Sequence, residues 1–184
     1  MRCAASRGFA FFPGRIAELI PPCVFAGALS IAGEAPSGAA ADRLGAWLAA
    51  RQLACGGLCG RPEKAPDVCY SWWVLSSRAM LRRSRWVCRP ALRDFILRCQ
   101  DTAKGGISDR PDDEADVFHT FFGVAGLALM GYEGLEEMDP VFALPRSLTR
   151  SLGLDAAEGL DCGGPNGTLG DDDSADEGDA GGAA

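Results

Sequence analysis

The sequence predicts an all-α protein built from stacked helical hairpins, and two observations lead to this prediction. First, the segment Gly56–Pro62 (GGLCGRP) recurs as Gly105–Pro111 (GGISDRP), at an offset of 49 residues. Second, each copy alternates an amphipathic stretch with one that is apolar nearly all round, which is typical of an outer helix covering a buried inner helix. Hairpins that repeat in this way stack into a solenoid or close into a ring.

Each repeat has the same parts in the same order. The first helix of the second repeat places apolar side chains on one face at helical spacing: Leu92, Phe95, Ile96 and Cys99. A Gly-Gly turn ends that helix, and a loop containing Arg-Pro leads to an aspartate that can cap the next helix. The inner helices are therefore expected to begin near Asp67 and Asp116. Because they are apolar on nearly every side, we expect them to be buried.

The repeats define the predicted organisation of the chain. They occupy residues 23–150, and residues 23–33 are expected to be the inner helix of a preceding repeat. Residues 139–145 are predicted to form an extended closing segment. Residues 1–22 are interpreted as a divergent or misassigned N-terminus, and residues 151–184, rich in Gly, Ala and Asp, as a disordered acidic tail.

The net charge of −7 belongs to that tail. Nine of the 25 acidic residues follow residue 154, whereas all 18 basic residues precede it, so the body of the chain is close to neutral. The arginines between Arg78 and Arg89 are not interleaved with aromatic side chains, and they are interpreted as a helix C-terminus with its loop. We therefore expect no nucleic-acid partner. No run of 18 apolar residues occurs, so no membrane span is expected.

The eight cysteines are scattered, and a chain of this size needs no disulfide framework. They are interpreted as reduced thiols, which predicts a cytoplasmic location.

One combination of residues predicts chemistry. His119 is the sole histidine, and it occupies the repeat position of Tyr70, beside Cys69 and close to Asp67. Because neighbouring repeats stack side by side, Asp67, Cys69 and His119 are expected to converge. A carboxylate, a thiolate and an imidazole suit Zn²⁺, and three protein ligands leave the open fourth position of a catalytic site.

Simpler interpretations of each residue stay open. A lone histidine on an apolar helix is often a hydrogen-bonded core residue. Asp67 can be a plain helix cap, and Cys69 a small buried hydrophobic residue. Asp116, at the equivalent position in the second repeat, can orient His119 instead of binding metal.

A second group of residues suits a lipid diphosphate. Arg61 and Lys64 stand just before the inner helix and can bind a diphosphate, although they can equally be solvated loop charges. Aromatic side chains gather at the start of both inner helices: Tyr70, Trp72, Trp73, Phe118, Phe121 and Phe122. Such a wall suits an isoprenoid chain, and it equally suits a packed core.

These motifs resemble the β subunits of protein prenyltransferases. The segment Gly57–Lys64 (GLCGRPEK) with Pro66–Trp73 (PDVCYSWW) is similar to their zinc and diphosphate segment, and Asp116–Thr120 (DVFHT) to their second zinc segment. The pair Trp72-Trp73 and the closing segment Asp139–Pro145 (DPVFALP) resemble the Rab geranylgeranyl (type II) branch. The similarity covers roughly residues 23–150, which corresponds to the C-terminal half of such a subunit.

The resemblance implies an α-α toroid, here an incomplete ring. It implies zinc bound by Asp67, Cys69 and His119. It implies that the diphosphate of geranylgeranyl diphosphate is bound by four residues: Arg61, Lys64, Tyr70 and Trp73. Trp72 and Phe118 would lie near the lipid. The implied reaction is thioether formation on the C-terminal cysteines of Rab GTPases, with an α subunit as partner and an escort protein that presents the Rab.

Two departures from the family pattern shape the expectations. Family β subunits are longer than residues 23–150, and their diphosphate-binding histidine has no counterpart near Arg15–Leu19. We therefore expect a fragment or truncated gene product, with catalysis by the full-length protein and not by this chain alone. Two alternatives remain, an inactive helical-repeat interaction protein and a farnesyl or type I geranylgeranyl transferase β subunit.

Overall fold

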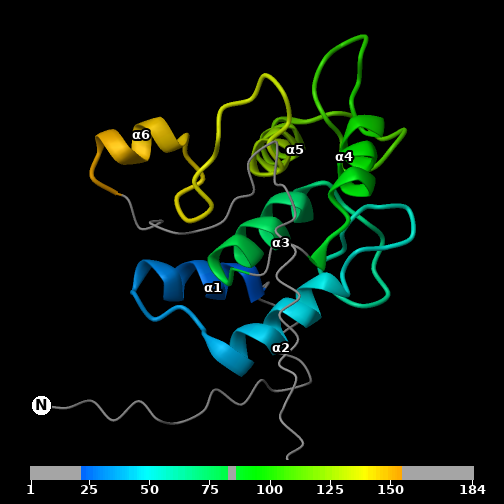
Figure 1. Cartoon of the computed structure of the whole chain (residues 1–184). Coiled ribbons are helices and arrows are strands. Elements are labelled where there is room, and N and C mark those ends of the chain that lie inside the picture. Colours follow the sequence, from blue (N-terminus) through cyan, green and yellow to red (C-terminus); the bar gives the residue numbers. More distant parts are fainter. Residues whose placement is uncertain (1–21, 83–85, 155–184) are drawn as a thin grey trace, which may run out of the picture.

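The computed structural model describes residues 22–82 and 86–154, which form α-helices joined by loops (Figure 1). The helices are α1 (Pro22–Ile31), α2 (Gly38–Ala49), α3 (Cys69–Met80), α4 (Arg89–Arg98), α5 (Val117–Leu129) and α6 (Arg146–Ser151). Within the described ranges, β pairing is limited to isolated bridges. The all-α prediction is confirmed. The predictions for the N-terminus and for the acidic tail fall almost entirely on residues outside these ranges.

The helices form an inner and an outer layer. The inner helices are α1, α3 and α5, and α3 lies between the other two and packs against both (Figure 1). The outer helix α2 packs against α3, and α4 packs against α5. Helix α1 falls on the segment in which a preceding inner helix was expected. Across the part of the chain described here, no helix combines the length and hydropathy needed to cross a membrane.

The sequence repeat is also a repeat of backbone geometry. Gly56 and Gly105, the first glycines of the two turns, both have a left-handed φ, of 91° and 86°. Glu63 and Asp112, again 49 residues apart, are left-handed as well, at 62° and 71°. The same antiparallel bridge closes both turns: Gln52–Leu58 and Gln100–Ile107. The repeated motif therefore specifies one turn conformation twice.

The core lies between the layers. Helix α3 is buried along most of its length, and α4 contributes Leu92, Phe95 and Ile96, each at most 2% exposed. Burying one such side chain stabilises the fold by about 1.5–3 kcal/mol. Their spacing in the sequence predicted that they share one face of this helix, and their common burial confirms the prediction.

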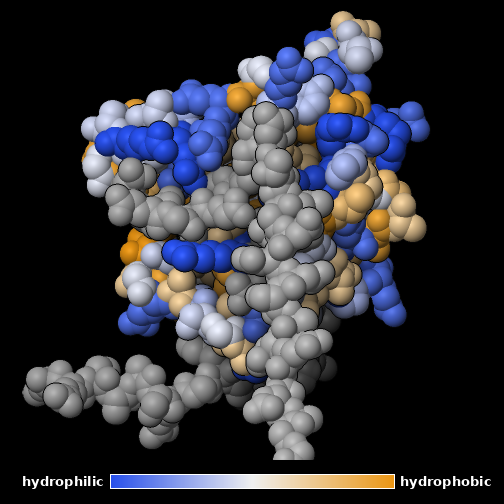
Figure 2. Space-filling view, viewed as in Figure 1, coloured by the Kyte–Doolittle hydropathy of each residue, from blue (hydrophilic) through white to orange (hydrophobic). Residues whose placement is uncertain are grey.

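The prediction that the inner helices are buried on every side is wrong for α5. Val117 is 89% exposed, and Phe118, Phe121 and Val124 are exposed as well. The reason is that α3 has inner helices on both flanks, whereas α5 packs against α3 on one flank only. No other inner helix among residues 22–82 and 86–154 covers the opposite flank of α5. The face in Figure 2 shows hydrophobic surface interspersed with hydrophilic surface among the coloured residues.

Residues 139–145 form a closed turn and not the extended segment that the sequence suggested. The Asp139 carboxylate is fully buried, and its Oδ1 accepts the backbone N–H groups of Val141 (2.8 Å) and Phe142 (3.0 Å). The backbone N–H of Asp139 donates to the carbonyl of Leu144 at 2.7 Å. An aspartate that bonds to the backbone two residues ahead stabilises a turn, which explains the difference.

The arginine cluster lies where α3 ends. Arg78 stands in the last turn of α3, as expected, but its side chain is fully buried. Burial, followed by the nearby charge of Arg89, lowers the pKa of Arg78 to about 10. The guanidinium lies 5.5 Å from the centroid of the Trp86 ring. Arg89 is the first residue of α4, so Arg78 and Arg89 lie at the ends of two different helices. Arg83 and Arg85 lie outside the described residues.

Cys55, Cys59, Cys69, Cys88 and Cys99 are free thiols. Burial raises the pKa of Cys99 to about 12. Cys99 is 3% exposed, and its thiol donates to the carbonyl of Phe95. It is therefore a neutral core residue at physiological pH.

We expect the free energy of unfolding to fall between about pH 9 and pH 12 because of Cys99. In the unfolded chain this thiol ionises near its ordinary pKa of 9.0, whereas in the folded chain it stays protonated until about pH 12. A raised folded-state pKa thus contributes stability below pH 9 that is lost above it, at no more than about 1.4 kcal/mol per pH unit. Denaturant unfolding at pH 8 and pH 10.5 measures the change. The Cys99→Ala variant should show a smaller decline, and an identical decline would contradict the prediction.

Candidate metal centre

The first two candidate ligands lie at the start of α3. Asp67 Oδ1 accepts the backbone N–H of Cys69 at 2.8 Å, and so satisfies an orphan donor of the first turn. The backbone N–H of Asp67 donates to the carbonyl of Leu58 at 3.0 Å. Cys69 is the first residue of α3, with 7% of its surface exposed. The turn of the first repeat therefore fixes both side chains at one helix end.

The third candidate, His119, lies in the first turn of α5. Asp116 is the N-cap of α5, and its Oδ1 accepts the backbone N–H of His119 at 2.8 Å. Its Oδ2 lies 2.6 Å from His119 Nδ1. The backbone N–H of His119, and then its ring, hold the pKa of Asp116 below its usual value. An ionised carboxylate accepts a hydrogen from Nδ1, which leaves Nε2 with a lone pair for a metal ion.

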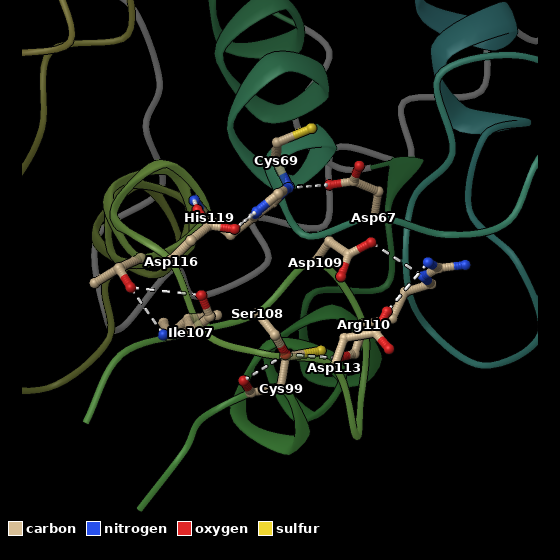
Figure 3. A network of polar contacts seen from close by, with 11 residues as sticks. Asp67, Cys69, Cys99, Ile107, Ser108, Asp109, Arg110, Asp113, Asp116 and His119 are labelled. Carbon is tan, nitrogen blue, oxygen red and sulfur yellow. Dashed lines mark hydrogen bonds and ion pairs between the residues drawn. The ribbon is translucent and has the colours of Figure 1, made fainter. Parts of the chain in front are cut away.

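The structure brings the three predicted ligands together. One ligand atom each from Asp67, Cys69 and His119 lies within 4.8 Å of the other two, and His119 Nε2 is 3.4 Å from Asp67 Oδ1. Figure 3 shows the three side chains where the starts of α3 and α5 meet. The backbone N–H of Val68 donates to the carbonyl of Asp109 at 2.9 Å, and this bond joins the two turns.

The donor set fits zinc. With bonds of about 2.0–2.3 Å, two ligand atoms of a tetrahedral zinc site are separated by about 3.3–3.8 Å. A spread of up to 4.8 Å therefore requires side-chain movements of about 1 Å. The oxygen, sulfur and nitrogen donors come from both hairpins, and a fourth coordination position is left for another ligand.

The simpler interpretations hold in part. Val68 occupies the N-cap position of α3, but Asp67, one residue earlier, accepts the first N–H of the helix through Oδ1. Cys69 is buried as a small hydrophobic residue would be. His119 is not a core histidine, because its side chain is 17% exposed and lies between two carboxylates, Asp67 and Asp116. At Asp67, accepting this N–H and binding a metal are compatible, since Oδ1 accepts the Cys69 N–H and the carboxylate has a second oxygen.

The predicted diphosphate residues lie on the loop that enters α3 and on its first turns. Arg61 is half-buried and Lys64 is exposed, and the backbone N–H of Lys64 donates to the carbonyl of Arg61 at 3.4 Å. Tyr70 and Trp73 are half-buried. Diphosphate binding by these four residues remains a prediction.

The aromatic side chains fall into two groups. Trp72 is 3% exposed and belongs to the hydrophobic core. Phe122 contacts Trp73 with ring centroids 5.0 Å apart, and Phe118 with centroids 4.8 Å apart. The ring of Phe118 also meets the imidazole of His119 edge-on at 5.1 Å. An aromatic surface thus adjoins the candidate metal ligands, and its contact with lipid remains a prediction, as does that of Trp72.

Sequence reasoning did not single out Gly60. An added Cβ at this position would lie 2.1 Å from the Tyr70 ring, so the glycine and the tyrosine form one unit. A comparison of the repeats could have pointed to it, because the equivalent pair in the second repeat is Asp109 and His119.

Stacked hairpins with three candidate ligands at the starts of two inner helices define a helical-repeat protein with a candidate metal centre. Residues 16–144 match the family described as the prenyltransferase alpha-alpha toroid domain, and the chain belongs to this family. The predicted family and the predicted toroid class are thereby confirmed.

Curated relatives refine the comparison. The chain is 51% identical over 144 residues to geranylgeranyl transferase type-2 subunit beta of Saccharomyces cerevisiae, covering 77% of this chain and 44% of that protein. It is 53% identical over 104 residues to type-2 subunit beta 1 of Arabidopsis thaliana, covering 56% and 32%. The type-1 subunit beta of Dictyostelium discoideum is 30% identical over 119 residues, covering 65% and 32%. The chain thus spans less than half the length of these relatives, and it is more similar to the two type-2 subunits.

A solved structure agrees on the fold. Candida albicans protein geranylgeranyltransferase-I complexed with GGPP superposes with a TM-score of 0.57 at 24% sequence identity, covering 63% of this chain and 38% of that one. At this identity the likeness supports the toroid fold alone.

Proposed function

We propose that this chain provides the zinc-binding part of a type II protein geranylgeranyltransferase β subunit. The reaction would transfer a geranylgeranyl group from geranylgeranyl diphosphate to the C-terminal cysteines of Rab GTPases. The observation on which the proposal depends is the convergence of Asp67, Cys69 and His119 from two hairpins. The identity to type-2 β subunits supports the choice of branch.

The roles of the residues follow from their positions. Asp67, Cys69 and His119 would hold the zinc ion, and Asp116 would keep the His119 ring oriented through Nδ1. Bound zinc would lower the pKa of a coordinated substrate thiol, so that the thiol is present as thiolate at neutral pH.

The electrophile would be bound by the neighbouring loop and the aromatic surface. Arg61 and Lys64 would neutralise the diphosphate, and Tyr70 and Trp73 would bind it beside them. Phe118 and Trp72 would lie near the isoprenoid chain, where apolar rings exclude water. The new S–C bond forms as the C–O bond to diphosphate breaks. Diphosphate leaves with the electron pair, and the proton of the thiol passes to solvent.

The proposed partners follow the same family pattern. They are a prenyltransferase α subunit, as in a heterodimer, and a Rab GTPase presented by an escort protein. We also propose a cytoplasmic location, supported by the free thiols.

A chimera tests the function of this region. Residues 23–150 would replace the aligned part of the Saccharomyces cerevisiae subunit, and the product would be expressed with its α subunit. We expect transfer of geranylgeranyl to a Rab tail, with His119→Ala lowering kcat by about 100-fold or more because a metal ligand is lost. The matched control is Asp113→Ala, which removes an exposed carboxylate from the loop before α5.

Three results would change the conclusion. A folded chimera that binds zinc without transferring lipid would support the inactive interaction protein. A chimera that prefers farnesyl diphosphate in competition would contradict the type II branch. Turnover by the unmodified chain with an α subunit would contradict the expectation that this chain alone is inactive.

A further inference from the structure

The backbone of Gly60 lies directly against the phenol end of Tyr70. A Cβ added to Gly60 would lie 2.1 Å from Tyr70 Cζ, 2.2 Å from its hydroxyl oxygen and 2.5 Å from Cε1. Such separations are shorter than any non-bonded carbon contact, so no side chain fits here while Tyr70 keeps its place. The added Cβ would therefore clash with the hydroxyl end of the Tyr70 ring.

The backbone itself does not require glycine at position 60. Gly56 has a φ of 91°, which strongly favours glycine, but Gly60 is not among the glycines with positive φ. An L-residue could therefore adopt the Gly60 conformation without strain. The three atoms nearest to its added Cβ all belong to Tyr70, so space for that ring is what requires the glycine.

The second repeat provides an internal comparison. At the offset of 49 residues, Gly60 corresponds to Asp109 and Tyr70 to His119. The His119 ring is turned toward Asp116, and the loop position equivalent to Gly60 carries the Asp109 side chain, which pairs with Arg110. The turn itself therefore does not require glycine at this position. Glycine occurs here in the repeat that carries a tyrosine at the facing helix position.

We propose that Gly60 is a positioning residue that sets where the Tyr70 hydroxyl lies next to Arg61. The backbone of Tyr70 lies in the first turn of α3, where its N–H donates to the carbonyl of Asp67 at 3.1 Å. The ring thus spans from the helix to the loop and ends at the residue before Arg61. The functional meaning of this contact rests on the proposed function, in which Tyr70 and Arg61 bind a diphosphate.

The chain contains two tyrosines, so incorporation of 3-fluorotyrosine gives two ¹⁹F resonances that the Tyr132→Phe variant assigns. We expect Gly60→Ala to shift the Tyr70 resonance and to leave that of Tyr132 in place. Titration of the zinc-loaded full chain with inorganic pyrophosphate should move the Tyr70 resonance. Gly60→Ala should raise the Kd by about fivefold or more. The control is Gly27→Ala, whose Cβ would meet only Met80 Cε at 3.8 Å.

A double-mutant comparison separates positioning from a general structural role. Tyr70→Ala removes the ring, so Gly60→Ala should add no further loss of pyrophosphate affinity in that background, measured by calorimetry because the Tyr70 resonance is absent. If Gly60→Ala alone fails to fold, the double variant should fold, because the clash is gone; an unfolded double variant would overturn the proposal. Unchanged binding by Gly60→Ala, or an additional loss in the Tyr70→Ala background, would overturn it as well. If the unaltered chain binds neither pyrophosphate nor geranylgeranyl diphosphate, the diphosphate site itself is wrong, and the positioning role falls with it.

Discussion

Replacing His119 by alanine is expected to reduce the zinc content of the purified chain from about one ion to a small fraction of that. The imidazole is the only nitrogen donor among the three candidate ligands, and its Nε2 is 3.4 Å from the Asp67 carboxylate. Without it, two donors on one helix end remain, fewer than the three or more protein ligands of known zinc sites. Asp67→Ala and Cys69→Ala should have the same effect. Elemental analysis after dialysis against a weak chelator measures the content.

Asp116→Ala should give an intermediate result. The carboxylate orients His119 through Nδ1 at 2.6 Å without being one of the three converging donors. Loss of such an orienting group typically lowers metal affinity by about 10–100-fold. Cys55→Ala and Asp113→Ala are matched controls, because they remove an exposed thiol and an exposed carboxylate. Equal zinc content in the His119→Ala variant and the unaltered chain would contradict the metal centre and the proposed function together.

The repeat made both the fold and the triple predictable. Two copies of one turn motif indicated two hairpins in the same conformation, and the left-handed residues 49 positions apart show that the conformation does recur. Because stacked repeats place equivalent positions side by side, residues 67, 69 and 119 could be assigned to one place without coordinates. Their convergence needed no knowledge of individual side-chain contacts.

The misses involve features that depend on neighbours and not on the pattern. The exposed flank of α5 follows from which helices surround it, and hydropathy alone does not report this. The turn at residues 139–145 depends on a single aspartate that bonds to the backbone ahead of it. The fit of Gly60 against Tyr70 is a contact between a loop and a helix. The burial of Arg78 likewise results from packing at the end of α3 and not from local sequence.

Substitution of Gly126 by leucine is expected to destabilise the fold by about 1–3 kcal/mol or more. Gly126 lies where α5 crosses α3, and its added Cβ would come within 2.9 Å of Ser71 Cβ and 3.5 Å of the backbone nitrogen of Trp72. Both contacts are with the core of α3, which cannot move away as the tip of a flexible side chain would. The two inner helices must therefore separate or shift to admit the leucine. Urea unfolding of the full chain measures the cost.

The same substitution should weaken zinc binding, because the two helices carry the ligands. Cys69 lies two residues before Ser71 on α3, and His119 lies about two turns before Gly126 on α5. A shift at the crossing therefore changes the separation of sulfur and imidazole, even though Gly126 touches neither. The control is Val124→Leu, which enlarges an exposed residue of the same helix and should change neither stability nor zinc affinity by much. If Gly126→Leu lowered stability while zinc affinity, measured by chelator competition on the folded fraction, stayed the same, the ligands would be held by their turns alone. The close packing of α3 on α5 would then have no part in forming the metal site.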